Sequence, residues 1–158
     1  MRAPSRRMVL LLTFLAVLAV VMPFLVWHQT WFGRRLSEGE IERYLRDPQR
    51  PRKIQHALSQ ISDRIARNDP AVAGLYPSVV ETARHPEHAI RATAAWVMGQ
   101  DNTSEAFHQA LLRLLEDPDL LVRRNAALSL VRFRDGSGRA ELVAMLQSHA
   151  ATAPANSA

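Results

Sequence analysis

The chain has 158 residues and carries 20 Lys and Arg against 15 Asp and Glu, which suits one modest domain with appendages. Three of the positive charges lie in the first seven residues. The remaining 17 Lys and Arg are nearly balanced by 15 Asp and Glu, so the chain lacks the basic excess typical of a nucleic-acid-binding domain. Because cysteine is absent, disulfides and thiolate metal sites are excluded.

Residues 8–27 form an uninterrupted apolar run of 20 residues, which predicts a transmembrane helix. At about 1.5 Å per residue, such a helix spans roughly 30 Å, the thickness of a hydrocarbon core. A basic tail (residues 1–7) precedes the run and a juxtamembrane linker (residues 28–36) follows it. The side chains expected at the membrane interface are Arg6, Arg7, Trp27, Trp31, Phe32, Arg34 and Arg35. The alternative is a cleaved signal peptide, although its apolar region is usually only about 7–15 residues long.

The arginines on the two sides of this run indicate its orientation. Arg2, Arg6 and Arg7 lie close to its N-terminal side, whereas only Arg34 and Arg35 follow on the other side. The positive-inside rule therefore predicts a single-pass membrane protein with its N-terminus in the cytoplasm. The domain that follows would lie outside the cytoplasm, in the periplasm of a Gram-negative cell.

From residue 37 to residue 148 the chain shows about seven short helices joined by loops of two to five residues, and no alternating strand pattern. Ser37 and Glu40 form a capping box at the first helix start. Asp-Pro or His-Pro pairs mark later starts, at residues 69–70, 85–86 and 117–118. Gly99 is well placed to end a helix. Residues 149–158 contain no Lys, Arg, Asp or Glu and show no hydrophobic periodicity, which indicates a disordered tail.

Two of these helices repeat one another at an interval of 32 residues. The segment HPEHAIRATAAWVM (residues 85–98) aligns without a gap with DPDLLVRRNAALSL (residues 117–130). Three apolar residues in each copy lie within about 80° of one helix face, namely Ile90, Ala94 and Met98, and Val122, Ala126 and Leu130. The small alanine lets a partner helix approach, and the next helix pair must cover the apolar face. The repeat therefore predicts an all-α fold, an α-solenoid of helix pairs preceded by one transmembrane helix.

The paired segments resemble HEAT repeats of the short type also found in relatives of the phycobilin lyases. They share the Asp-Pro start, the Val-Arg or Ile-Arg step, the Ala-Ala pair and the terminal Leu or Met. The resemblance is good over residues 69–148 and weak over residues 37–67. It implies a right-handed solenoid, with the first pair acting as a degenerate terminal repeat.

The resemblance also implies a ladder between neighbouring repeats, built from an Asp that opens the second helix and an Arg six residues later. Asp117 and Arg123 fit this pattern, and Arg124 beside them is expected at the rim of the same surface. In the first repeat the corresponding cation is Lys53, which follows Asp47. The middle repeat has His85 in place of the Asp before Arg91, which predicts that the ladder is interrupted there.

The sequence offers no catalytic or cofactor-binding constellation. His85 and His88 lie near Glu81 and Glu87 and could in principle hold a metal, but a helix cap and a solvated side chain are the simpler interpretation. The DGSG segment at residues 135–138 follows a helix rather than a strand, so it is a turn and not a phosphate loop. We expect no catalytic residue, no cofactor and no metal.

The region that follows the apolar run is rich in cations, namely Arg34, Arg35, Arg43, Arg46, Arg50, Arg52 and Lys53. Acidic residues are interleaved with them, so a solvated, salt-bridged face is one interpretation. Contact with anionic lipid head groups is the other, because this part of the chain leaves the membrane.

Apolar residues occupy a position of the second helices where HEAT-like repeats usually carry polar ones. Trp96 and Leu128 hold this position, and Leu58 is assigned to the equivalent place in the first repeat. Together they would form a binding strip, unless neighbouring helices cover them.

These observations predict a non-catalytic scaffold, assembly factor or accessory subunit of a membrane complex. Its partners would be another protein and, through residues 8–27, the lipid bilayer, with no nucleic acid and no small-molecule substrate. One alternative is a lyase-like or chaperone-like domain that acts on a prosthetic group, by analogy of fold. Another is a free periplasmic adaptor, released by signal cleavage.

Overall fold

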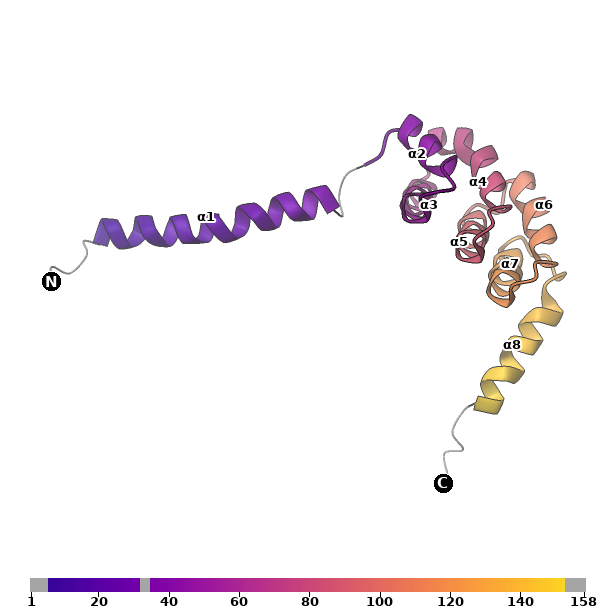
Figure 1. Cartoon of the computed structure of the whole chain (residues 1–158). Helices are drawn as coiled ribbons and strands as arrows, with labels where there is room; N and C mark the ends of the chain where they lie inside the picture. Colours follow the sequence, from indigo (N-terminus) through magenta and orange to yellow (C-terminus); the bar gives the residue numbers. More distant parts are fainter. Residues whose placement is uncertain (1–5, 32–34, 153–158) are drawn as a thin grey trace, which may run out of the picture. The chain divides into compact units, whose positions relative to one another are not determined.

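The computed structural model describes residues 6–31 and 35–152, and all regular structure within these ranges is helical (Figure 1). The chain divides into two units, Met1–Arg35 and Leu36–Ala158. The second unit is called the solenoid domain below.

The described part of the first unit includes the helix α1 (Arg6–Trp31), which continues through Pro23. Over Arg6–Leu25 it is long and apolar enough to cross a membrane, by length and composition, and none of that stretch is buried. The hydroxyl of Thr13 donates a hydrogen bond to the carbonyl of Val9 (2.9 Å), which satisfies this polar group within the helix itself. Of the predicted interface residues, Phe32 and Arg34 lie outside the described residues. Trp27 and Trp31 lie in α1 at positions whose side chains are not described.

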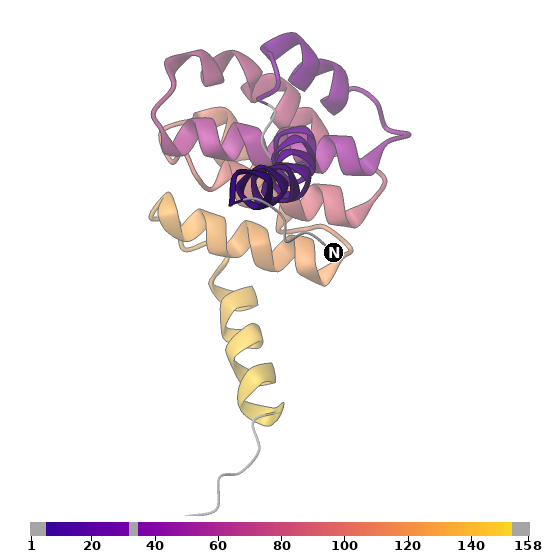
Figure 2. The same cartoon turned by 90° about the vertical axis from the view of Figure 1, so that its left-hand side faces the viewer.

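The solenoid domain begins at Leu36 and consists of helices in two rows. Its elements are α2 (Glu38–Leu45), α3 (Pro51–Ala66), the 3₁₀ helix η1 (Pro70–Leu75), α4 (Tyr76–Thr82), α5 (His88–Met98), α6 (Glu105–Leu114), α7 (Leu120–Arg132) and α8 (Arg139–Thr152). The second helices of the pairs, α3, α5 and α7, contact one another in one row and run across Figure 2 one below the other. The first helices α2, α4 and α6 form the other row (Figure 1). This arrangement is that of an α-solenoid.

The core lies between the two rows and follows the 32-residue repeat. All six residues predicted on the repeated face are fully buried, namely Ile90, Ala94, Met98, Val122, Ala126 and Leu130. The largest fully buried side chain is Phe107 of α6, whose ring centroid lies 4.2 Å from that of Tyr76. The predicted packing of helix pairs is therefore confirmed for α4 to α7.

A close approach of α5 and α7 explains the glycine at the end of α5. Gly99 has φ −68°, an ordinary right-handed value, so its backbone conformation does not require glycine. A Cβ at this position would lie 2.4 Å from Oγ of Ser129, whose hydroxyl donates to the carbonyl of Ala95 (2.9 Å). Gly99 is thus needed because a neighbouring helix occupies the space of its side chain.

The first residue of the solenoid domain is held by polar side chains of α3. The backbone N–H of Leu36 donates to Oε1 of Gln60 (2.8 Å), and the guanidinium of Arg64 donates to its carbonyl (2.6 Å). The capping box predicted from Ser37 and Glu40 is present at the start of α2. Polar side chains of α3 therefore bind the incoming chain at its first residue.

Several helix starts differ from the predicted ones. The helix expected after Asp69-Pro70 is divided into η1 and α4, and Pro77 lies in the first turn of α4, where its missing N–H costs nothing. Helix α7 begins at Leu120 and is capped by Asp119, whose carboxylate accepts from the backbone N–H of Leu121 (2.9 Å). The cap is therefore not Asp117, which is free for another role.

Replacement of Ala126 by leucine is expected to destabilise the solenoid domain by about 1–3 kcal/mol, because Ala126 is fully buried at a helix contact with no room for three more carbons. Urea unfolding followed by circular dichroism measures this loss. A matched change at the exposed residue Ala106 of α6 should leave stability nearly unaltered. An unchanged unfolding midpoint for Ala126→Leu would mean that the repeat register is wrong.

Candidate functional site

Large exposed apolar side chains in the described part of the solenoid domain lie on three helices. Its seven large apolar residues that are 43–66% exposed all lie on α5, α7 or α8: Trp96, Leu120, Leu121, Leu128, Val131, Val143 and Leu146. In the described residues of α2, α3, α4 and α6, no large apolar side chain is exposed to this extent. The large exposed apolar side chains therefore lie on α5 and α7, two of the three second helices, and on α8.

Two of the three predicted strip residues are exposed and the third is not. Trp96 is 47% exposed and Leu128 is 48% exposed, as the repeat position predicts. Leu58 is fully buried, so its assignment to the strip is wrong. The buried residues of α3 match those of α5 at a spacing of 36 residues, which pairs Leu58 with Ala94 rather than with Trp96. A shift of two residues turns a side chain by about 200° around the helix, from the surface into the core.

The exposed residues of α5 and α7 flank a shallow groove of about 340 Å³. Its lining is uncharged and comes from α3, α5 and α7: Gln55, Ala89, Ala92, Thr93, Trp96, Leu121 and Asn125. Leu128 and Val131 extend the apolar surface along α7. We call Trp96, Leu121, Leu128 and Val131 the apolar ridge.

Sequence reasoning missed Leu121 and Val131 of this ridge. Both lie outside the repeated core positions, and their exposure depends on which helices pack around α7. One signal was available, because α7 carries apolar residues around most of its circumference and a single packed face cannot bury all of them.

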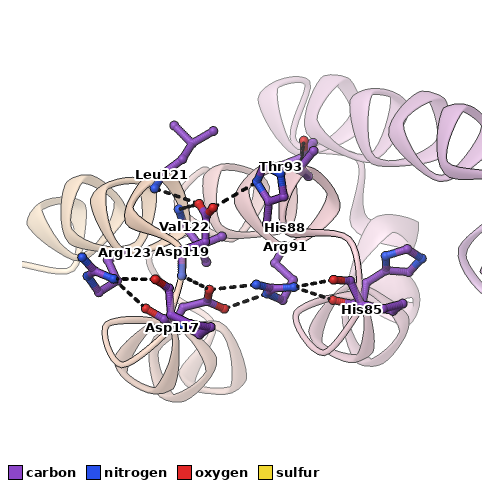
Figure 3. Close-up of polar contacts among 12 residues, drawn as sticks. His85, His88, Arg91, Thr93, Asp117, Asp119, Leu121, Val122 and Arg123 are labelled. Atoms are coloured by element: carbon purple, nitrogen blue, oxygen red, sulfur yellow. Dashed lines mark hydrogen bonds and ion pairs between the residues drawn. The ribbon is translucent and has the colours of Figure 1, made fainter.

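A ladder of charged side chains joins neighbouring repeats (Figure 3). The guanidinium of Arg91 on α5 donates two hydrogen bonds to the carboxylate of Asp117 at the start of the next repeat, at 2.7 and 2.8 Å. Its third nitrogen donates to the carbonyls of His85 and Pro86. The hydrogen bonds from Arg91 lower the pKa of Asp117 and raise that of Arg91, although burial acts against both shifts. The predicted interruption at Arg91 is therefore wrong.

Arg123 repeats this geometry one repeat later. It donates to the carbonyls of Asp117 and Pro118 (2.9 and 3.0 Å) and forms an ion pair with Glu141 of α8 (3.2 Å). Arg124 lies 3.8 Å from the same carboxylate and donates to Ser148. These contacts hold α8 against α7.

The interruption falls one repeat earlier than predicted. No hydrogen bond or ion pair joins Lys53 to His85 among the described residues, and the ammonium of Lys53 instead lies 4.8 Å from the ring centroid of Tyr44. A rung pairs a cation with the acid of the following repeat, so His85, which stands where Asp117 stands one repeat later, offers no acid to the first repeat and leaves the rung of Arg91 intact. At the spacing of 36 residues the counterpart of Arg91 in α3 is Gln55, which carries no charge either.

The histidines considered as metal ligands have other contacts. Nδ1 of His85 accepts from the backbone N–H of Glu87 (3.0 Å), and Nδ1 of His88 lies 3.2 Å from Asp119 (Figure 3). Across residues 6–31 and 35–152, no group of three or more His, Asp or Glu side chains is arranged to hold a metal ion.

Two polar contacts between distant residues had no sequence signal. The hydroxyl of Tyr76 donates to Asp101 (2.6 Å), and burial together with this bond raises the pKa of Tyr76. His108 lies 2.7 Å from Asp135 and stacks on Phe133, which ties α6 to the turn before α8. Hydrogen bonds from Ser137, followed by that from His108, lower the pKa of Asp135 to about 2.

The domain is an α-solenoid of helix pairs in which an Arg–Asp ladder joins neighbouring repeats. This is the architecture of a repeat protein. The chain belongs to the HEAT repeat family, whose pattern matches residues 76–156, just over half of its length. The match begins at the first residue of α4. No curated protein and no solved structure matched the chain.

Proposed function

We propose that this protein is a membrane-anchored, non-catalytic scaffold that binds another protein through the apolar ridge. HEAT repeats are in general protein-interaction modules that use the surface formed by successive helices. The observation that carries the proposal is the confinement of large exposed apolar side chains to α5, α7 and α8 among the described residues of the solenoid domain. Singly scattered apolar residues need no explanation, but seven large ones that share three helices, two of them beside one groove, indicate an interaction surface.

The composition of this surface suits the centre of a protein interface. Interface centres are depleted in charge and enriched in aromatic residues, and the groove beside Trp96 is lined by uncharged side chains. The other row differs, because α4 and α6 expose charged or polar residues such as Glu81, Glu105 and Gln109. An assembly factor or accessory subunit of a membrane complex would need one such face.

Helix α1 supports the membrane anchor in this proposal. Its apolar stretch is long enough to cross a bilayer, and arginines precede it. Under the positive-inside rule, the N-terminus would face the cytoplasm and the solenoid domain would lie outside it, in the periplasm of a Gram-negative cell.

Alkaline carbonate extraction of native membranes is expected to leave the protein in the pellet at its full mass of 17.8 kDa, because α1 would remain in the bilayer. Immunoblotting of pellet and supernatant measures this. A soluble product shortened by about 25–35 residues would show signal cleavage and contradict the anchor.

Trp96→Ala and Leu128→Ser are each expected to weaken partner binding by about 30-fold, since buried aromatic and apolar anchors are commonly worth about 2 kcal/mol. Both side chains are about half exposed, so the helical circular dichroism signal and the melting temperature should change little. Recovery of partners from native membranes by pull-down measures binding. Gln109→Ala on α6 is the control.

Two results would contradict the proposed surface. Early melting of both variants would show that the residues support the core. Normal folding with full recovery of every native partner would place the binding face elsewhere.

A further inference from the structure

The missing rung of the ladder leaves an imbalance of charge between the first and second repeats. His85 occupies the position that Asp117 holds 32 residues later, so the second repeat lacks the carboxylate that Asp117 supplies in the third. Its Nδ1 accepts from Glu87, which leaves the proton of the neutral ring on Nε2. Nε2 is buried and has no hydrogen-bond partner. Figure 3 shows the His85 ring turned away from the Arg91–Asp117 pair.

A cavity of about 640 Å³ lies at the start of α3, and its charged lining is mainly cationic. Arg50, Arg52 and Lys53 contribute three positive charges, and Glu87 contributes one negative charge. Arg52 is exposed and makes no described ion pair. Arg50 has only an exposed contact of 3.5 Å with Asp47. The cavity is therefore a concave surface with a net positive charge of two.

The backbone adds to this positive potential. Helix α3 has 16 residues and begins at Pro51, which has no N–H, and the N–H groups of Lys53 and Ile54 donate to the backbone carbonyl of Arg50. The N-terminal end of the helix dipole adds a partial positive charge near the three cations.

We infer that this cavity binds the phosphate of an anionic lipid head group. The inference rests on the proposed membrane anchor. Four residues, 32–35, lie between α1 and Leu36 in the sequence, so the solenoid domain is tethered to any bilayer that α1 spans. Phosphate fits the site because its oxygens accept several charge-assisted hydrogen bonds from guanidinium and ammonium groups.

The absence of cysteine allows a clean test on the full chain. A fluorophore is attached at Gln49→Cys, which lines the cavity, and a control label is attached at Gln109→Cys on α6. The labelled chain is reconstituted in vesicles of phosphatidylcholine alone or mixed with phosphatidylglycerol, with a quencher on the lipid head groups. We expect quenching at Gln49→Cys to be several-fold stronger in the anionic vesicles and quenching at Gln109→Cys to be unchanged.

The charge-neutral variant Arg50→Gln/Arg52→Gln/Lys53→Gln should reduce that quenching to the phosphatidylcholine level. Arg113→Gln/Arg134→Gln/Arg139→Gln removes the same charge from exposed positions of α6 to α8 and should retain the effect. If the triple variant loses its helical circular dichroism signal, the single variant Arg52→Gln is measured in its place. Equal losses in the two triple variants, or none in either, would overturn the site.

The source of the phosphate is tested separately. In detergent, glycerophosphoglycerol, the free head group, should shift the label at Gln49→Cys. A response to inorganic phosphate without any dependence on vesicle composition would overturn the lipid as ligand. Flotation with phosphatidylcholine vesicles tests the anchor alone. If the chain does not float, the membrane anchor of the proposed function and the lipid site are both contradicted. If it floats but the label at Gln49→Cys does not respond to anionic lipid, only the lipid site is contradicted.

Discussion

Asp117→Ala is expected to destabilise the solenoid domain by about 3–5 kcal/mol, because it leaves the buried guanidinium of Arg91 without its counter-ion. The two side chains are only 6% and 13% exposed and share two short hydrogen bonds. Urea unfolding measures the loss. Glu81→Ala is the matched control, since Glu81 pairs with Arg84 at 2.9 Å but both side chains are about 70% exposed. Its effect should stay within about 1 kcal/mol.

The same pair predicts a dependence on pH with a definite sign. The pKa of Asp117 in the folded domain lies below its ordinary value of about 3.9. Its contribution to stability is therefore fully present above that value and is lost as the pH falls through the folded pKa. The wild-type free energy of unfolding should fall more steeply below about pH 4 than that of Asp117→Ala. Equal slopes, or a loss no larger than that of Glu81→Ala, would contradict a stabilising ladder.

Phe107→Ala is expected to cost about 3–5 kcal/mol, because it opens a cavity where α6 packs against Tyr76 of α4. Phe107 is fully buried and is the largest side chain of the core. Thermal and urea unfolding measure the cost, and Leu146→Ala, at a residue that is 66% exposed, should have almost none. A small effect at Phe107 would mean that the two rows of helices do not enclose a common core.

The parts of the fold that were predictable from sequence are those in which the chain repeats itself. Residues 85–98 and 117–130 share one register, so a face identified in one copy was found in the other. The prediction paired Leu58 with Trp96 at a spacing of 38 residues, whereas the buried residues of α3 match those of α5 at a spacing of 36, which places Leu58 in the core. The register of a single divergent copy is set by tertiary packing, which local pattern does not reveal.

The site was harder to predict because its properties depend on neighbouring helices. The ladder pairs Arg91 with an acid 26 residues later, so the position six residues before Arg91, which holds His85, was the wrong one to inspect. The pair of His108 and Asp135 is separated by 27 residues and has no local pattern at all. Exposure of Leu121 and Val131 likewise follows from the arrangement of α7 among its neighbours.

Site-specific photo-crosslinking in native membranes tests the central claim most directly. A photoreactive residue replaces Leu128 in the full-length chain, and the same residue replaces Gln109 on α6 as the comparison. A scaffold that uses the apolar ridge predicts a discrete covalent adduct with another protein from position 128, in the membrane fraction, and none from position 109. No adduct from position 128, or the same adduct from both positions, would contradict it.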